Sequence, residues 1–380
     1  MTCQATSGPA RRACDASTAP TSCAKLASGY GVTRLENDLL RVALDDDGHL
    51  VSLFDKRAAR EVVPAGFVAK VLQLHPDYPN NWPAWDIDPF YNHSHLDIGR
   101  PRSIAVRSSG PEEAVLELEY EFSSSRVTET LRLEAGSEAL VVELEVEWHE
   151  HERLLKLALP LDVHADESVA EIQFGHLRRP THNNTSWDNA RFETVAHRYL
   201  YLGEAGYGVA LVNSGTYGHD VSSLPRQGGG KAAQARMTVI RSANFPDPRG
   251  ESGLHRFGYA IVPGATVEDA VRHGYWFNLP ARRANGAAPV APLVALSNDA
   301  IVVEAVKAAD DRSGDVVVRC YEALGGRADG VLTTSFSLAG AEVTDLLERR
   351  LEELSVAAGN QVHLQLRPFQ ILTLRLRPEQ

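Results

Sequence analysis

Residues 172–193 hold the densest group of ligand-competent side chains in this 380-residue sequence, and they read IQFGHLRRPTHNNTSWDNARFE. Amides and planar guanidinium groups can fork onto paired hydroxyls, and an aromatic plate beside them can stack on a sugar ring. The composition therefore favours a carbohydrate-facing loop. An ordinary surface loop is the other interpretation, because Asn, Thr and Ser side chains often hydrogen-bond to their own backbone.

Four segments, taken in order, resemble the C-terminal half of the family 38 glycoside hydrolases, the retaining zinc α-mannosidases. They are NWPAWDI at 81–87, RPTHNNTSWD with ARFE within 179–193, GYGVALVN with Tyr217-Gly218 within 206–218, and HRF with Tyr259-Ala260 within 255–260. The resemblance implies a β-rich chain that faces α-mannosides, with a role in mannose and glycan catabolism.

The catalytic pieces of that family cannot be placed in this sequence. The resemblance places a His-x-Asp pair, a zinc-binding nucleophilic aspartate and an acid/base aspartate in a preceding domain. Retaining hydrolysis needs two carboxyl groups about 5 Å apart, and no such pair is identifiable here. We therefore expect no catalytic residue, metal ligand or cofactor in this chain. Zinc would belong to the full-length enzyme, and a separate catalytic chain or domain would be a partner.

Candidate substrate-binding residues follow from the matched segments. They are His182, Asn183, Asn184, Trp187, Asp188, Arg191, Tyr217 and Arg256. Within the 172–193 segment, Trp187 is expected to be at least partly buried, and Arg191 to pair with Asp188 or Glu193.

A second irregular stretch, residues 75–100, contains Trp82, Trp85, Asp86 and Tyr91. It either forms a wall of the sugar site or caps one end of the core with its tryptophans.

Two further functions remain open. One is a stand-alone carbohydrate-binding module, supported by the loops rich in Trp and Asn. The other is a mutarotase-like aldose isomerase, in which His182 with Asp188 would act as the histidine and carboxylate. Whether the chain is an enzyme is left undecided.

Other histidine spacings resemble metal sites but are not expected to bind metal. They are His164 with Asp166, His149 with His151, and His93 with His95. Each lies in a polar turn or loop whose composition already accounts for it. No phosphate-binding glycine loop or Gly-x-Ser-x-Gly elbow occurs in a suitable context.

Composition restricts the partners and the compartment. A net charge of −12 argues against nucleic acid and anionic membrane surfaces. No apolar run approaches the roughly 20 residues of a membrane span. Three of the four cysteines precede residue 24 and the fourth is Cys320, a usage that a reducing cytoplasm tolerates.

Alternation with period two dominates the rest of the chain and predicts an all-β protein. A hairpin is expected around a turn at 46–48, solvated glutamate faces at 117–121 and 143–147, and one short helix near 266–276. The predicted parts are a dispensable disordered leader at 1–27, a large antiparallel super-β-sandwich of the galactose-mutarotase type at 28–279, a linker at 280–292, and a small β-sandwich at 293–380.

Overall fold

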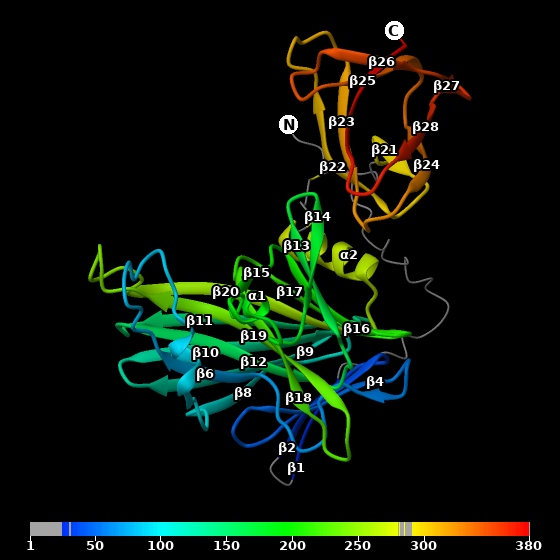
Figure 1. Cartoon of the computed structure of the whole chain (residues 1–380). Helices are drawn as coiled ribbons and strands as arrows, with labels where there is room; N and C mark the ends of the chain where they lie inside the picture. Colours follow the sequence, from blue (N-terminus) through cyan, green and yellow to red (C-terminus); the bar gives the residue numbers. More distant parts are fainter. Residues whose placement is uncertain (1–24, 30–31, 280, 282–284, 286–290, 380) are drawn as a thin grey trace. The chain divides into compact units, whose positions relative to one another are not determined.

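The computed structural model of the chain describes residues 25–29, 32–279, 281, 285 and 291–379 (Figure 1). Most of the expected leader and most of the expected linker lie outside these residues. Residues 25–27 of the expected leader belong to strand β1. The described chain forms two compact units. The larger is made from the described parts of 14–171 and 178–278, and the smaller from those of 279–380 with 172–177.

A nine-stranded antiparallel sheet forms one layer of the larger unit. Its strands, in spatial order, are β14 (Gly175–Pro180), β13 (Glu167–Ile172), β16 (Tyr199–Glu204), β17 (Tyr207–Asn213), β20 (Gly253–Pro263), β11 (Leu140–Trp148), β10 (Ser125–Glu134), β9 (Glu113–Phe122) and β8 (Ser103–Ser109).

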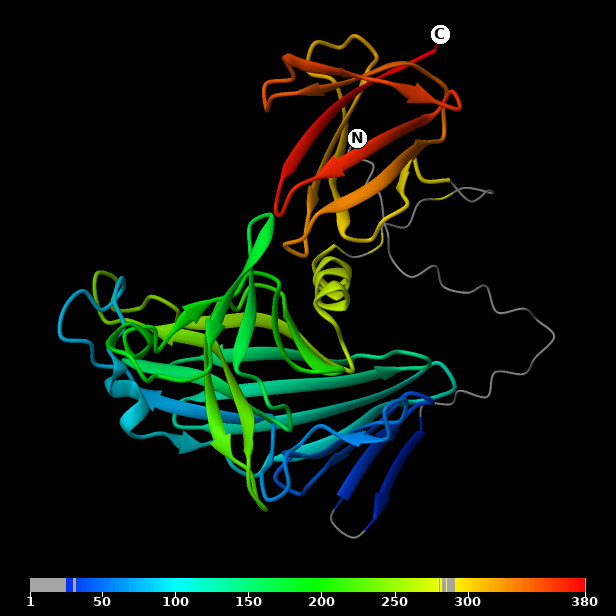
Figure 2. The ribbon, with the colours of Figure 1, turned by 45° about the vertical axis from the view of Figure 1, so that its right-hand side comes forward.

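Two further antiparallel sheets complete this unit (Figure 2). The six-stranded sheet contains β15 (Thr194–Val195), β18 (Gly218–Pro225), β19 (Lys231–Ser242), β12 (Arg153–Leu161), β6 (Val71–Pro76) and β7 (Leu96–Asp97). The five-stranded sheet contains β1 (Lys25–Gly29), β2 (Val32–Glu36), β3 (Leu40–Leu44), β4 (Leu50–Asp55) and β5 (Arg60–Glu61).

The core of this unit follows the alternation in the sequence. Along β11 every second residue from Leu140 to Trp148 is apolar and buried, whereas Glu143, Glu145 and Glu147 between them are exposed. Trp148 is fully buried and packs in one apolar cluster with residues from all three sheets. Removal of this apolar surface from water, at roughly 25 cal/mol per Å², is the main stabilising contribution. The 40–54 hairpin is confirmed, and so is the solvated glutamate face of β11, whereas in β9 Glu121 is exposed and Glu117 and Glu119 are partly exposed.

Helices are short and few in the described residues. Helix α1 spans Ser186–Asn189, the 3-10 helix η1 spans Pro89–His93, and α2 spans Val267–Asn278. Thr266 caps α2, because its hydroxyl accepts from the amide of Asp269 at 3.1 Å while the Asp269 carboxylate accepts from the amide of Thr266 at 2.9 Å. The helix predicted near 266–276 is therefore confirmed. Within the described chain, no helix is long and apolar enough to cross a membrane.

The smaller unit is a sandwich of two antiparallel sheets with its own apolar core. One sheet contains β21 (Val294–Leu296), β24 (Ala328–Thr334), β28 (Gln361–Leu366) and β27 (Val356–Ala357). The other contains β22 (Ile301–Ala308), β23 (Val316–Glu322), β29 (Ile371–Pro378), β25 (Leu338–Thr344) and β26 (Arg350–Leu354). An all-β chain ending in a small sandwich is thus confirmed.

Candidate functional site

A buried ionic network connects the two polar loops that the sequence singled out. At its centre is Lys156 on β12, whose fully buried Nζ atom lies 2.6 Å from Glu193 Oε2 and 2.8 Å from Asp220 Oδ2. Glu193 also accepts hydrogen bonds from the hydroxyls of Tyr91, at 2.8 Å, and Thr238, at 2.6 Å. We call these five residues the Lys156 network. It joins η1 and the segment after α1 to strands β12, β18 and β19.

The charges of this network are balanced. Arg236 on β19 lies 2.9 Å from the second oxygen of Asp220, so two cations face two carboxylates. Balance matters because an unpaired buried charge is strongly unfavourable. Burial, followed by the charge of Glu193, raises the pKa of Tyr91. Its hydroxyl therefore stays protonated and remains a donor.

Two buried histidines flank the network. His75, at the end of β6, is bonded through Nδ1 to the carbonyl oxygen of Tyr91 at 2.9 Å. Burial lowers the pKa of His75 to about 4. His219 on β18 contacts the carbonyl oxygen of Tyr217 at 3.1 Å, and burial lowers its pKa as well. Both rings are therefore neutral at neutral pH and serve as hydrogen-bonding parts of the scaffold.

The 77–88 loop presents aromatic side chains to solvent. Arg241 on β19 fixes this loop, because its Nε atom lies 2.6 Å from Asp77 Oδ2 and its guanidinium also reaches the carbonyl of Asp86. Trp82 and Trp85 are 66% and 69% exposed, and with Asp86 they line an open pocket of about 510 Å³. Such exposure excludes the interpretation in which these tryptophans cap the core.

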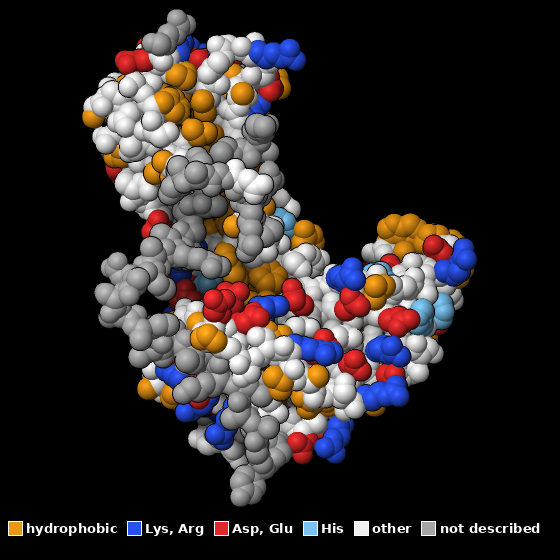
Figure 3. All heavy atoms as spheres, turned by 180° about the vertical axis from the view of Figure 1, so that it is seen from behind, with side chains coloured by type: hydrophobic (Ala, Val, Ile, Leu, Met, Phe, Trp, Pro, Cys, Tyr) orange, Lys and Arg blue, Asp and Glu red, His pale blue; other side chains and the backbone are white. Residues whose placement is uncertain are grey.

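The 77–88 loop and η1 together form the 77–93 loop. Figures 1 and 2 show it, in cyan, beside the yellow-green loop at 243–252. These two loops project from the larger unit, and in Figure 3 hydrophobic side chains gather at the tip of that projection, at the right of the view. The most exposed apolar residues of the two loops are Tyr78, Trp82, Trp85 and Phe245. This concentration of exposed aromatic surface is typical of a binding surface.

The α1 turn is a surface feature. The Thr185 hydroxyl caps it by accepting from the amide of Asp188 at 3.1 Å and donating to the Asp188 carboxylate at 2.7 Å. His182 Nδ1 lies 3.6 Å from the same carboxylate. Trp187 is 74% exposed, so the expectation that it is partly buried is wrong. A single helical turn with no buried residue has no core-facing side on which to place the indole.

The expected pairing of Arg191 is also wrong. The carboxylate of Glu193 lies against Lys156, and that of Asp188 lies against Thr185 and His182. Arg191 is exposed and donates only its backbone amide, to the carbonyl of Asp188 at 3.0 Å. Glu193, which the sequence analysis offered as a partner for the exposed Arg191, therefore pairs with the buried Lys156 instead.

The remaining candidate residues do not all lie together. Asn183 and Asn184 are exposed beside His182 in the loop before α1. Tyr217 is 47% exposed, and its ring meets that of His197 edge-on at 5.2 Å. Arg256, by contrast, lies on β20 and forms an exposed pair with Glu145 at 2.9 Å. In the part of the chain that the structure describes, no hydrogen bond or ion pair joins Arg256 to the 181–193 segment.

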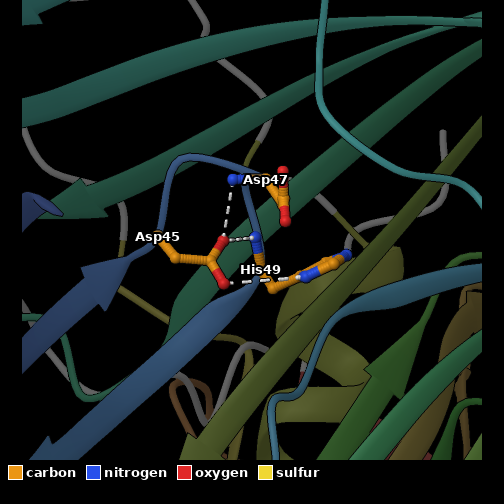
Figure 4. Close-up of side chains that lie close together, drawn as sticks. All are labelled: Asp45, Asp47 and His49. Carbon is orange, nitrogen blue, oxygen red and sulfur yellow. Dashed lines mark hydrogen bonds and ion pairs between the residues drawn. The ribbon is translucent and has the colours of Figure 1, made fainter. Parts of the chain in front are cut away.

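A group of possible metal ligands occurs elsewhere, in the hairpin turn between β3 and β4 (Figure 4). Asp45 Oδ1 accepts from the amides of Asp47 at 3.0 Å and His49 at 2.8 Å, while His49 Nδ1 lies 3.7 Å from Asp45 Oδ2. These contacts are those of an Asx turn. The group does not fit the zinc that the resemblance implies, because the central carboxylate already closes the turn.

Three comparisons place the chain among known proteins. Residues 35–249 match the glycosyl hydrolases family 38 C-terminal domain, and residues 300–374 match the family 38 C-terminal beta sandwich domain. The fold and these matches define the β portion of a glycosidase. The chain belongs to glycosyl hydrolase family 38.

Its curated relatives are α-mannosidases. The chain is 34% identical over 359 residues to human alpha-mannosidase 2C1, covering 91% of this chain and 34% of that protein. Identity to alpha-mannosidase G of Dictyostelium discoideum is 29% over 361 residues, covering 90% and 32%. The chain thus spans about a third of the length of these relatives.

A solved structure confirms the fold. The alpha-mannosidase from Enterococcus faecalis V583 superposes with a TM-score of 0.72 at 16% sequence identity, over 92% of this chain and 43% of that one.

The sequence interpretation missed the Lys156 network. One signal was present: Lys156 is the only charged residue between Leu154 and Leu161, a strand that is otherwise apolar. A lone lysine within a buried strand needs a buried counter-charge. The partners could not be named, because Glu193 and Asp220 lie 37 and 64 residues further along the chain.

Proposed function

We propose that this chain is the carbohydrate-facing, non-catalytic half of an α-mannosidase. The observation that carries the proposal is an exposed set of aromatic and amide side chains on loops fixed by a buried ionic network. Trp82, Trp85 and Trp187 expose indole faces on which the C–H face of a sugar ring can stack. Asp86 and Asn183 offer hydrogen-bonding groups nearby in the same loops.

In this proposal, a separate catalytic domain or chain carries out the hydrolytic chemistry of the whole enzyme. Among the described residues, the one group of three possible metal ligands is the Asp45 turn, which does not fit the family's zinc. We therefore expect no release of the aryl group from aryl α-mannosides by this chain, with or without added zinc. Zinc-dependent release that follows this protein through purification would overturn that part of the proposal.

Sugar binding is tested by titrating methyl α-mannoside and following the ligand by saturation-transfer NMR. Trp82→Ala/Trp85→Ala should weaken binding by about tenfold or more, because stacking on each aromatic ring contributes about 0.5–1.5 kcal/mol. The matched control is Trp276→Ala, which removes a half-exposed tryptophan on α2 and should leave binding unchanged. Equal binding by both variants would place the sugar elsewhere.

A stand-alone carbohydrate-binding module is the second candidate. The open pocket lined by Trp82, Trp85 and Asp86 favours it, because such a surface can bind a glycan without a catalytic partner. Binding by the isolated chain that equals binding by the chain supplied with a catalytic half would favour the module. A large gain on assembly would favour the half-enzyme.

A cytoplasmic location is also proposed, on the basis of Cys320. This thiol is free and fully buried, and burial raises its pKa to about 12. A buried neutral thiol behaves as a small apolar side chain and needs no oxidising environment.

A further inference from the structure

The β25–β26 hairpin carries the most exposed of the large apolar residues that the structure describes in the smaller unit. Leu346, Leu347 and Leu351 are 69%, 72% and 67% exposed, more than any other large apolar side chain among the described residues of this sandwich. Exposed leucines scattered singly need no explanation, but three within six residues form a patch. The hairpin therefore has the surface of an interaction site.

Strand β26 is also an open sheet edge. It ends the order β22, β23, β29, β25, β26, so one side of its backbone has no neighbouring strand among the described residues. A bulge lies near its start: Glu352 is opposite Val343 and Arg350 is opposite Thr344, while Leu351 between them has no partner in β25. Bulges discourage long ladders at an edge. Any strand added here must be short.

Charges of opposite sign flank Leu351: Arg349, just before β26, and Arg350 on one side, and Glu352 and Glu353 on the other. The sequence from 349 to 353 reads Arg-Arg-Leu-Glu-Glu. If a second copy of this strand runs antiparallel, with the two-fold axis at Leu351, then Arg350 lies opposite Glu352 of the other copy and Arg349 lies opposite Glu353. All four cross-strand charge pairs are then attractive, and the two Leu351 side chains meet at the axis.

The same side chains are weakly held within the chain. Arg349 pairs with Asp345 at 2.7 Å and Arg350 with Glu353 at 2.5 Å. Both arginines and Glu353 are more than half exposed. Exposed pairs of this kind contribute little to stability, so exchanging them for partners on another molecule costs little.

We propose that β26 is a self-association edge, at which two copies of this chain pair antiparallel about Leu351. The partner strand is a second copy of this chain. Opposite charges on the two sides of Leu351 make the strand complementary to its own antiparallel copy, whereas an unrelated strand would match it only by chance. An interface of two short strands and a leucine patch is small, so the association is weak and reversible. This edge belongs to the smaller unit, whereas the proposed carbohydrate surface belongs to the larger one.

The test is sedimentation velocity on the full chain over a concentration series. The unaltered chain should show concentration-dependent dimerisation that weakens as salt is raised. Arg349→Glu/Arg350→Glu makes the strand all acidic, and Glu352→Arg/Glu353→Arg makes it all basic. Each variant alone should dimerise at least tenfold more weakly, because every attractive pair becomes repulsive.

Mixing the two variants is the decisive measurement. In a mixed pair every acidic position faces a basic one, so the heterodimer should form at least as well as the original dimer. The matched control is Arg327→Glu/Arg367→Glu, which changes the charge equally at exposed loop positions of the same unit and should leave dimerisation unchanged. A chain that stays monomeric at every concentration, or variants that do not recover on mixing, would overturn the proposal.

Discussion

Lys70 and Lys156 are both buried lysines of the larger unit, but Lys70 connects core strands whereas Lys156 connects a core strand to a surface loop. Lys70 pairs with Glu129 on β10, and the hydroxyls of Tyr120 and Tyr259 lie 3.4 Å from that carboxylate. Those partners all belong to core strands. Lys156 instead pairs with two carboxylates, one of which arrives on the segment after α1.

The difference shows how a buried charge can serve a surface. Around Lys70 one ion pair joins core elements and reaches no loop of the candidate site. Around Lys156 the carboxylate of Glu193 also fixes Tyr91, and so the buried side of the 77–93 loop. The exposed tryptophans can project into solvent because the buried side of their loop is fixed by the contact between Tyr91 and Glu193.

The largest effect expected is that of Lys156→Met. It leaves Glu193 buried without its cation, and breaking a buried pair costs about 3–5 kcal/mol. We expect a loss near 5 kcal/mol in urea denaturation, because Asp220 loses a partner as well. Lys231→Met, which removes a partly exposed lysine paired with the exposed Asp166, is the control and should change stability by under about 0.5 kcal/mol. Similar losses for the two variants would remove the distinction between network and surface.

Lys70→Met should be less severe and, unlike Lys156→Met, reversible by a second change. The single variant leaves Glu129 as an uncompensated buried charge and should cost about 3 kcal/mol. Lys70→Met/Glu129→Leu removes both charges and should recover most of that loss, since apolar replacement of a buried pair is often neutral. Denaturation of the single and double variants checks this. A double variant no more stable than the single one would show that Glu129 has a further role.

The pH dependence of stability sharpens the comparison, because His75 flanks the Lys156 network and not the Lys70 pair. Its folded-state pKa of about 4 lies below the unfolded value near 6.5, so the unfolded chain binds more protons between these values. Stability from this group is full above pH 6.5 and falls as the pH drops toward 4. By pH 5 the loss should be about 2 kcal/mol. His75→Gln should remove that part of the slope, and an unchanged slope would contradict the assignment.

Much of the fold was predictable and much of the site was not. Period-two alternation predicted β9 and β11, because their buried and exposed residues follow the pleat. The same rule fails at Glu129, which occupies an inward position of β10 and is fully buried. Its partner Lys70 is 59 residues away, so no local pattern could show the pair.

The loops show the same limit. Residue types within 172–193 and 75–100 indicated a polar, aromatic surface. They could not show which aromatic residues are buried, since Tyr91 is 2% exposed and Trp187 is 74% exposed. The burial of Tyr91 depends on Glu193 and Lys156, which are distant from it in sequence. The burial of a loop residue depends on tertiary partners, and the sequence names the residues without naming those partners.

The smallest effect on stability is expected for Trp187→Ala, at the other end of the comparison from Lys156. Truncating a fully buried tryptophan costs about 3–5 kcal/mol, and Trp148→Ala should show that loss. Trp187 is 74% exposed on a single helical turn, so its truncation should cost under about 0.5 kcal/mol. Its effect should appear instead in sugar binding, measured by the same NMR titration as for the Trp82 and Trp85 variant. A Trp187→Ala protein that loses stability but keeps binding would mean that the indole is a packing residue, and that the buried network alone does not hold the loop.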